Sequence, residues 1–274
     1  MTRAAVLGSP VAHSLSPILH SAAYAGMGLT DWSYGRHECD EQGLAGFLAG
    51  LDPAEWAGLS LTMPLKRVAM ASAAWVSDLS LAVGGANTLV WREWGWAAHN
   101  TDVEGISTAL IEAGITTPRA AVVLGAGATA ASALAALREL GHGGPVTVLA
   151  RDTTRTREVA AAAERLGVVT RVAPLAKVEE YLDTDLVVST LPSGAADEYV
   201  EALARSRADL FDVVYAPWPT KAAEAVAARG GRVVGGFPML LHQAVAQVRL
   251  MTGIEEVPVA AMRAAGEAEL ARRA

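Results

Sequence analysis

A glycine-rich turn between an apolar strand-like stretch and an alanine-rich helix-like stretch constrains the fold of this chain more than any other feature. Residues Ala120–Leu124 are apolar, Gly125–Ala130 has the spacing G-x-G-x-x-A, and Ala128–Leu140 is typical of a helix. Val146–Ala150 follows as a second strand-like stretch. Together these residues predict a βαβ unit of about 30 residues, which requires a parallel sheet covered by helices.

The glycine-rich turn is predicted to bind the phosphates of a dinucleotide. Gly125 permits a tight turn, Gly127 lets the backbone approach a pyrophosphate, and Ala130 still allows the helix to pack closely on the strand. The first N–H groups of that helix have no partner within it and attract an anion. An ordinary turn in a chain rich in alanine and glycine is the alternative interpretation. The predicted cofactor contacts are Gly125, Ala126, Gly127, Ala128, Thr129 and Ala130.

The residues after the second strand distinguish between the two nicotinamide dinucleotides. An NAD site favours an acidic side chain there for the ribose 2′-OH, whereas an NADP site favours a cation for the 2′-phosphate. Arg151 and Arg155 favour NADP. Asp152 favours NAD, because a carboxylate repels a phosphate unless it turns away or pairs with arginine. A solvated helix start is the alternative for the arginines. We predict NADP as the cofactor.

Short apolar runs alternate with helix-like stretches along nearly the whole chain, which is the pattern of an α/β fold. Ser16 is expected to cap a helix that has Pro17 at its first position. The predicted strands are 4–7, 32–38, 56–62, 87–91, 95–99, 120–124, 146–150, 186–189, 210–214 and 233–234. Strands 87–91 and 95–99 are expected to pair as a hairpin. The predicted helices are 17–26, 44–51, 102–113, 128–140, 159–166, 239–251 and 259–270.

Composition and charge exclude several classes of protein. Of the 274 residues 52% are hydrophobic, and the net charge of −7 argues against a nucleic-acid partner. The one cysteine, Cys39, excludes a disulfide framework, and no spacing of potential ligands predicts a metal site. The 18 uncharged residues Ala120–Leu137 approach the length of a membrane span, but two glycines interrupt them. Because no basic-then-apolar leader opens the sequence, the cytoplasm is the expected location.

Five clusters of small polar residues lie outside the βαβ unit, at the predicted ends of strands and helices, where binding groups concentrate. They are Ser14–Ser16, Thr62–Lys66, Gly85–Thr88, Asn100–Asp102 and Met239–Gln243. Each has an ordinary structural alternative, such as a cap, a turn or a solvated surface position. Lys66 is unusual because the chain uses arginine for most of its 22 basic residues. Lysine can lose its proton in a protein and arginine cannot, so this lysine indicates proton-transfer chemistry.

In order and spacing these clusters resemble the shikimate dehydrogenase family over essentially the whole chain. Gly8–Pro17 matches the family pattern Gly-x-Pro-(Ile/Val)-x-His-Ser-x-Ser-Pro, and motifs similar to Thr-x-Pro-x-Lys, Gly-Ala-x-Asn-Thr and Asn-Thr-Asp follow. Asp212–Tyr215 and Met239–Gln243 match its last two motifs. The chain departs from the family at residues 150–152, which are Ala-Arg-Asp instead of Asn-Arg-Thr, and at Ala216, which replaces a frequent Asn.

The resemblance implies a role for each matching residue. Ser14 and Ser16 resemble the hydroxyls that hold the substrate carboxylate, and Lys66 with Asp102 resembles the catalytic pair. The other implied substrate contacts are Thr62, Asn87, Tyr215 and Gln243. The residues implied in the nicotinamide pocket are Ser189–Leu191, which include Thr190, and Gly236. The sequence leaves open which member of the catalytic pair carries the proton.

The resemblance also implies the architecture and the reaction. We expect two α/β domains around a cleft: a substrate-binding domain of residues 1–101 and 239–274, and a Rossmann-type NADP-binding domain of residues 102–238. The implied reaction is the reversible NADPH-dependent reduction of 3-dehydroshikimate to shikimate in aromatic amino-acid (chorismate) biosynthesis. It needs a proton donor at the ketone oxygen.

Three alternatives to this reaction stay open at the level of sequence. Two share the fold: an NAD-linked quinate/shikimate dehydrogenase and an aminoshikimate dehydrogenase. The third is a nucleotide-sensing protein without turnover. In each case the expected partner is a small molecule, not a nucleic acid or a membrane. The protein is expected to be a monomer or a homodimer.

Overall fold

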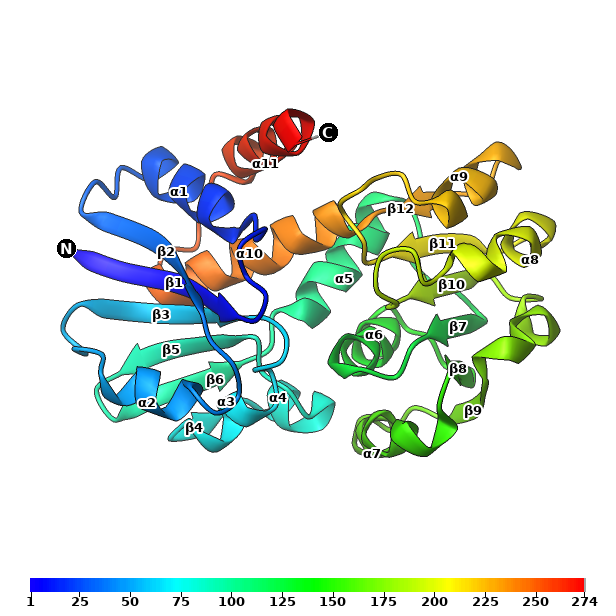
Figure 1. Ribbon diagram of the computed structural model, residues 1–274, viewed down its shortest axis with the longest axis horizontal. Helices are drawn as coiled ribbons and strands as arrows, with labels where there is room; N and C mark the ends of the chain where they lie inside the picture. The colour runs from blue at the N-terminus through cyan, green and yellow to red at the C-terminus, as the bar shows by residue number, and fades with distance from the viewer. Residues whose placement is uncertain (274) are drawn as a thin grey trace. The chain divides into compact units, whose positions relative to one another are not determined.

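The computed structural model describes residues 1–273, except for the side chain of Arg155, and Figure 1 shows its helices and strands. The described chain forms two compact units. The first contains Met1–Asp102 and the C-terminal segment from Leu240 onwards, and the second contains Val103–Met239. Within the described residues each unit has one sheet of six strands. The predicted α/β fold class is confirmed, whereas a cleft between the two domains stays a prediction.

The sheet of the first unit is mixed, with the strand order β2-β1-β3-β5-β6-β4. β1 is parallel to β2 and β3, while β5 is antiparallel to β3 and β6, which confirms the predicted hairpin. The ends of β3 and β6 therefore lie beside the start of β5. The strands are β1 (Thr2–Gly8), β2 (Trp32–Glu38), β3 (Trp56–Leu61), β4 (Trp75–Val76), β5 (Thr88–Arg92) and β6 (Gly95–His99).

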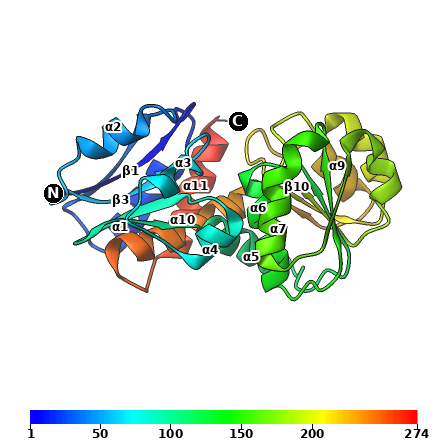
Figure 2. The ribbon, with the colours of Figure 1, turned by 90° about the horizontal axis from the view of Figure 1, so that it is seen from below.

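Alternation along β3 sends neighbouring side chains to opposite faces of this sheet. Leu59 enters a buried core with side chains of α2 (Leu44–Ala49) and α3 (Val68–Ala71). Gly58 and Ser60 face α10 (Gly236–Thr252) instead: a Cβ on Gly58 would lie 2.7 Å from Met251 Cγ, and Ser60 Oγ donates to Gln247 Oε1 at 2.7 Å. Figure 2 shows α2 and α10 on the two sides of the sheet. Glycine at position 58 thus lets α10 pack directly on β3.

Three further helices complete the first unit, and α1 and α11 pack against each other. Their bounds are α1 (Ser16–Gly26), α4 (Asp78–Val83) and α11 (Val259–Arg273). The start of α1 differs from the prediction, because its N-cap is Leu15, which makes no side-chain capping bond. The prediction that Ser16 caps this helix is wrong: Ser16 is the first helical residue, and its own N–H donates to Ser14 Oγ at 3.2 Å.

The sheet of the second unit is parallel throughout, with the strand order β12-β11-β10-β7-β8-β9. The chain enters at β7 in the middle, moves outward to β9, returns to β10 beside β7, and moves outward on the other side to β12. This is a doubly wound sheet, and right-handed crossovers place its helices on both faces. The strands are β7 (Ala121–Leu124), β8 (Val146–Ala150), β9 (Thr170–Pro174), β10 (Leu186–Ser189), β11 (Asp209–Asp212) and β12 (Val233–Val234).

Helices cover both faces of this parallel sheet, and Figure 2 shows α6 and α7 side by side on the face opposite to α9. All four residues of β7 are buried, as expected for a central strand covered on both faces. The helices are α5 (Asp102–Glu112), α6 (Ala128–Glu139), α7 (Arg157–Leu166), α8 (Val200–Arg205) and α9 (Lys221–Ala228). Short 3-10 helices are η1 (Thr153–Thr156), η2 (Leu175–Tyr181) and η3 (Asp197–Tyr199).

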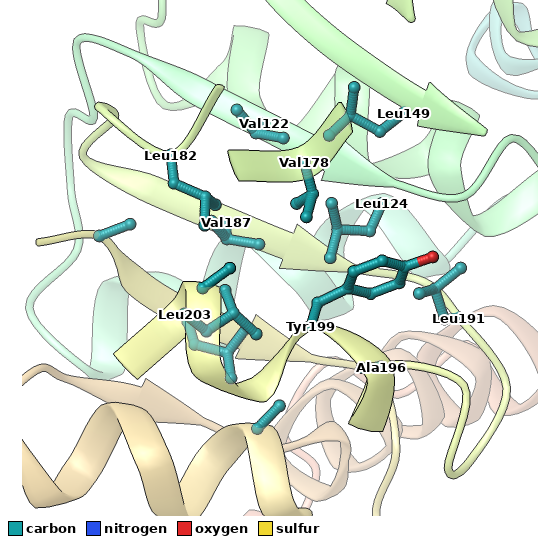
Figure 3. Packing of buried hydrophobic residues seen from close by; sticks show 14 of the residues in the cluster. Val122, Leu124, Leu149, Val178, Leu182, Val187, Leu191, Ala196, Tyr199 and Leu203 are labelled. Carbon is teal, nitrogen blue, oxygen red and sulfur yellow. The ribbon is translucent and has the colours of Figure 1, made fainter. Parts of the chain in front are cut away.

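The core on one face of the second sheet is a continuous apolar cluster, shown in Figure 3. Leu124 of β7 and Val187 of β10 point into it, together with Leu203 of α8. Tyr199 and Leu191 also belong to it. This packing holds the ends of β7 and β10 side by side, so the turns that follow these strands start from a rigid base.

The differences between the expected and observed elements have local causes. β9 is absent from the prediction because only one of its residues is buried, so it lacks a clear apolar pattern. α10 begins at Gly236, three residues before the predicted start, although glycine is a poor helix former.

Among the described residues, none of the helices has both the length and the apolar character required to cross a bilayer.

The buried imidazole of His20 predicts an acid sensitivity of the fold. Burial lowers the pKa of His20 from 6.5 to about 4, against the smaller opposite effect of its hydrogen bond with the Ser16 carbonyl oxygen. The unfolded chain binds this proton at higher pH, so the free energy of unfolding should decrease as pH falls from about 6.5 to about 4, by up to about 3 kcal/mol. The ring stacks on Tyr34, with centroids 3.9 Å apart, and His20→Phe retains an aromatic ring.

Urea unfolding of the wild type and of His20→Phe between pH 4 and pH 7 measures this contribution. The variant should lose less stability over this range than the wild type. Parallel curves for the two proteins would contradict the assignment of acid sensitivity to His20.

Candidate active site

The polar clusters of the first unit gather at one edge of its sheet. The loops Ser9–Leu15 and Thr62–Arg67 follow the ends of β1 and β3, and Asn100–Asp102 follows β6. Asn87 immediately precedes β5, which runs in the opposite direction, so it lies at the same edge. Backbone hydrogen bonds fix this arrangement: Leu61 N donates to the Asn87 carbonyl oxygen at 2.7 Å, and Asn87 N donates to the His99 carbonyl oxygen at 3.0 Å.

Lys66 and Asp102 form an ion pair at this edge, with Lys66 Nζ 2.6 Å from Asp102 Oδ2. The side chain of Asp102 is 5% exposed and that of Lys66 is 17% exposed. Lys66 is also fixed through its backbone, because its carbonyl oxygen accepts from Ala86 N at 2.7 Å. The pair is thus largely desolvated, while the Lys66 side chain keeps partial access to solvent.

Asn87 occupies the centre of the hydrogen-bond network around Asp102. Its Nδ2 donates to Asp102 Oδ1 at 2.8 Å and to Thr101 Oγ1 at 2.9 Å. Its Oδ1 accepts from Thr101 N at 2.8 Å and from Thr88 Oγ1 at 2.9 Å. With Lys66 on Oδ2 and Asn87 on Oδ1, each carboxylate oxygen of Asp102 has a donor.

Gln243 joins this group from α10. Its Oε1 accepts from Asn87 Nδ2 at 3.4 Å, and its Nε2 donates to the Leu240 carbonyl oxygen at 2.8 Å. Four residues predicted from the sequence, Lys66, Asn87, Asp102 and Gln243, therefore lie in one connected cluster.

Ser14, Ser16 and Thr62 lie in the loops at the same sheet edge, although the structure records no direct bond from them to the ion pair. Ser16 is buried, while Ser14 and Thr62 are half-buried. Thr62 is held next to β1, because its N–H donates to the Leu7 carbonyl oxygen at 2.9 Å. A Cβ on Gly8 would lie 2.2 Å from Thr62 Cγ2, so this close approach requires glycine.

The glycine-rich turn of the second unit has the geometry that its sequence predicts. Gly125 has a φ of +107°, and a Cβ at this position would lie 2.4 Å from Thr190 Oγ1. Thr190 is fixed there, since its Oγ1 donates to the Leu124 carbonyl oxygen at 2.8 Å. Gly127 is the N-cap of α6, and a Cβ on it would meet no atom within 4 Å. Ala130 is fully buried, which allows α6 to pack closely on the sheet.

The turn after β10 and the residues around Gly236 lie in the same unit. A Cβ on Gly236 would lie 1.9 Å from the Val213 carbonyl oxygen, so glycine is required where α10 begins. Tyr215 is half-buried in the loop after β11. Asp212 anchors this loop through Thr220 Oγ1, which donates to its Oδ2 at 2.9 Å, and burial raises the pKa of Asp212.

Arg151 and Asp152, which point to different cofactors in the sequence, have different surroundings at the end of β8. Asp152 is the N-cap of η1, and its Oδ1 accepts from Thr154 N at 2.9 Å and from Thr154 Oγ1 at 2.6 Å. The carboxylate is thus used within its own turn, while Arg151 is exposed. The side chain of Arg155, the other predicted phosphate contact, lies outside the described residues.

Two further features of the described residues, possible metal-binding groups and the cavities, do not add to the predicted site. Within residues 1–273 no group of three or more His, Cys, Asp or Glu side chains could hold a metal ion. A cavity of about 660 Å³ lies in the second unit, at the sheet edge opposite to the glycine-rich turn. Its lining residues include Arg119, Asp183 and Arg207, and none of them is a predicted site residue.

Sequence reasoning assigned no role to several polar residues that the structure places in the cluster. Thr101 holds Asn87 from the loop after β6, and Gln247 donates to Thr88 Oγ1 at 3.2 Å from α10. Gln247 follows Gln243 by four residues, a spacing that places both side chains on one face of a helix. That spacing was the available signal. Ser60 lies on a strand whose other residues are mostly apolar and carries no such signal.

Comparison with protein-family models matches residues 6–89 to the shikimate dehydrogenase substrate binding domain and residues 236–265 to the shikimate 5'-dehydrogenase C-terminal domain. A curated relative, the shikimate dehydrogenase (NADP(+)) of Thermus thermophilus, is 36% identical over 281 residues, covering 100% of this chain and 99% of the relative. The chain belongs to the shikimate dehydrogenase family. The resemblance predicted from the sequence motifs is thereby confirmed.

Solved structures of this family have the same fold. The shikimate dehydrogenase of Mycobacterium tuberculosis is 43% identical, with a TM-score of 0.88 over 98% of this chain and 100% of that chain. The shikimate 5-dehydrogenase of Thermus thermophilus in complex with NADP(H) and shikimate is 34% identical, with a TM-score of 0.84 over 98% of this chain and 99% of that chain. The two-domain fold expected from the resemblance is confirmed.

The glycine-rich turn generates a prediction about stability in the absence of any ligand. Gly125→Ala forces a side chain into a left-handed conformation beside Thr190, which should lower the free energy of unfolding by about 1–3 kcal/mol or more. Gly127→Ala is the matched control, because its φ of −84° suits alanine and the space around it is open. Alanine is a poorer N-cap residue than glycine but reduces the entropy of the unfolded chain, so these opposed effects should leave a net change below about 1 kcal/mol. Urea unfolding of the ligand-free proteins measures both, and equal losses in the two variants would contradict the strained geometry at Gly125.

Proposed function

We propose that this protein is an NADP-dependent shikimate dehydrogenase, which reversibly reduces the ketone of 3-dehydroshikimate to the alcohol of shikimate in aromatic amino-acid (chorismate) biosynthesis. The observation that supports this most directly is the largely desolvated ion pair of Lys66 and Asp102, held at a sheet edge by Asn87. A ketone reduction needs a proton at the carbonyl oxygen, and such a pair can deliver one.

The proton-transfer step follows from the arrangement of the pair. The Lys66 side chain keeps partial exposure and so can reach a bound substrate, while Asp102, itself held by Asn87, limits its movement. In the direction of reduction, Lys66 or Asp102 gives a proton to the developing alkoxide oxygen. In the direction of oxidation, the same unit takes the proton from the alcohol. When bound, the nicotinamide supplies or accepts the hydride.

Hydroxyl and amide groups at the same edge are assigned to substrate binding. We assign Ser14 and Ser16 to the substrate carboxylate, because hydroxyl groups donate to a carboxylate without adding a charge that would attract phosphate. Thr62, Asn87 and Gln243 are assigned to the substrate hydroxyl groups. Tyr215 of the second unit is assigned as a further substrate contact. The first unit is therefore the substrate-binding domain, with residues 1–101 and 239–274.

The second unit is assigned to NADP, with residues 102–238. Its glycine-rich turn fits a dinucleotide, because Gly127 leaves open space at the N-terminus of α6 where a pyrophosphate would meet free N–H groups. Arg151 is exposed at the end of β8 and suits a 2′-phosphate, and Arg155 is assigned to the same group. Thr190 and Gly236 are assigned to the nicotinamide pocket. We further propose that the protein acts in the cytoplasm, as a monomer or homodimer.

Cofactor preference tests the proposed function directly. Among shikimate and quinate paired with NADP or NAD, shikimate with NADP should give the fastest formation of reduced cofactor at 340 nm. Arg151→Ala should raise the Michaelis constant for NADP about tenfold or more, the usual effect of losing a charge-assisted hydrogen bond, with little effect on NAD. Asp152→Ala is the matched control and should not improve NADP use, because Asp152 already bonds within its own turn. Faster turnover of quinate with NAD would favour the NAD-linked alternative.

The Lys66–Asp102 pair should act as one unit in turnover. Lys66→Ala should lower kcat by about 10²–10⁴-fold, the usual contribution of a positioned acid or base, and change substrate binding far less. Lys66→Arg should not restore activity, because the guanidinium stays protonated. Asp102→Asn keeps the shape of the side chain and should also act mainly on kcat.

The double variant Lys66→Ala/Asp102→Asn completes this experiment. Because both residues serve one step, its kcat should be scarcely lower than that of the poorer single variant. Fully additive losses would show that the residues act separately. Wild-type turnover in Lys66→Ala would exclude Lys66 from the proton transfer.

A further inference from the structure

A chain of buried polar side chains leads from the interior of the first unit to the carboxylate of Asp102. We propose that Thr88 and Gln247 are positioning residues for the Lys66–Asp102 pair, acting through the side-chain amide of Asn87. This inference rests on the proposed function, because it concerns the same catalytic pair. It adds Gln247, which no sequence motif identified, and it gives a role to Thr88, a motif residue to which the resemblance assigned none.

The link nearest to the pair is the hydroxyl group of Thr88. Thr88 Oγ1 donates to Asn87 Oδ1 at 2.9 Å, on the side of the amide away from Asp102. Gln247 Nε2 in turn donates to Thr88 Oγ1 at 3.2 Å and to the Asn87 carbonyl oxygen at 3.4 Å. Gln247 thus occupies a lone pair of the hydroxyl, so the single hydroxyl proton of Thr88 is directed towards Asn87.

Two more residues extend the chain on the far side of Gln247. Ser60 Oγ donates to Gln247 Oε1 at 2.7 Å, and Tyr34 OH donates to Ser60 Oγ at 2.6 Å. The phenol of Tyr34 also interacts with the side chain of Ser16. The chain Tyr34–Ser60–Gln247–Thr88–Asn87 therefore reaches from the neighbourhood of a proposed substrate contact to Asp102.

The carboxylate of Asp102 determines which group donates and which accepts at every hydrogen bond of this network. An ionised carboxylate only accepts, so Asn87 must present Nδ2 to Asp102 and Oδ1 to Thr88. Thr88 then has to donate to Asn87 and accept from Gln247 Nε2, which leaves Gln247 Oε1 to accept from Ser60. Thr101 N–H reinforces the same orientation of Asn87. Reversal of one link would place two acceptors or two donors against each other.

Burial makes this chain energetically significant. Thr88 is 0%, Gln247 1% and Ser60 3% exposed, so water does not replace a lost partner. In a low-dielectric interior such hydrogen bonds are stronger than in water, and linked bonds reinforce one another. The alternation described for β3 explains the geometry, since Ser60 and its pairing partner Thr88 on β5 both face α10.

The test compares two substitutions of the same residue. Thr88→Val keeps the shape and removes the hydroxyl, so kcat with shikimate should fall about three- to tenfold, while the KM for NADP stays within about twofold. Thr88→Ser keeps the hydroxyl and loses a methyl group, and it should restore kcat to within about twofold of the wild type. Gln247→Met, which removes the donor from the next link, should resemble Thr88→Val.

A matched control separates the hydrogen bond from the effect of burying valine. Thr184 is a threonine of the second unit, 9% exposed, whose hydroxyl has no hydrogen-bond partner among the described residues. Thr184→Val should leave kcat unchanged. Wild-type kcat in Thr88→Val, or an equal loss in Thr88→Ser and Thr88→Val, would overturn the proposal, because packing and not the hydroxyl would then be what matters.

A measurement independent of turnover keeps this inference separate from the proposed function. The side-chain NH₂ signals of Asn87 in a ¹⁵N–¹H NMR spectrum can be assigned as the pair missing from Asn87→Asp. They should shift in Thr88→Val and Gln247→Met, and stay in place in Thr88→Ser and Thr184→Val. Failure of the wild type to oxidise shikimate would reject the proposed function alone. Unmoved Asn87 signals in Thr88→Val would instead reject the positioning role of Thr88 and Gln247.

Discussion

The structure of the first unit depends on the compensation of one buried negative charge, the carboxylate of Asp102. A carboxylate taken out of water is strongly disfavoured unless a cation and hydrogen-bond donors replace the lost solvent. Lys66 supplies the cation on Oδ2, and Asn87 supplies a donor on Oδ1. Because removal of one partner of such a pair typically costs about 3–5 kcal/mol, the surrounding loops have little freedom to rearrange.

The mixed topology of the first sheet makes this compensation possible. β1 and β3 end at the edge where the antiparallel strand β5 begins, so residues far apart in the sequence meet there. A purely parallel sheet would bring only strand ends to this edge. The start of β5 instead contributes Asn87 and Thr88, whose backbones are already held by the neighbouring strands. The strands of the sheet therefore hold the backbone of the site rigid, and the loops supply most of its functional side chains.

Much of this could be predicted from the sequence, because its strongest signals are local. The glycine-rich turn, the hairpin and the alternating α/β pattern each depend on a few consecutive residues, and all are present in the structure. The cluster of Lys66, Asn87 and Asp102 was accessible only through the resemblance, since no local rule brings these three side chains together. The cap of α1 was predicted wrongly, because Ser-Pro is a common helix start and the chain shifts the boundary by one residue.

The polar residues behind the site show the limit of such reasoning. Ser60 and Gln247 are 187 positions apart, and their contact depends on the close packing of α10 on β3 at Gly58. A glycine in a strand indicates that another segment approaches closely there, but it does not identify that segment. Asp152 is a similar case, because nothing in the sequence pattern indicated that it is the N-cap of η1.

The division of the chain into units has a consequence for the order in which the two units can fold during synthesis. The first unit takes its early elements from Met1–Asp102 and its last helices from the segment after Leu240, whereas the second unit is one uninterrupted stretch. During synthesis the second unit is therefore complete while the first still lacks α10, which carries Gln243 and Gln247. Asn87 and the face of β3 at Gly58 therefore stay uncovered until the segment that forms α10 has been synthesised. The polar network around Asp102 can therefore close only after the whole second unit has been synthesised.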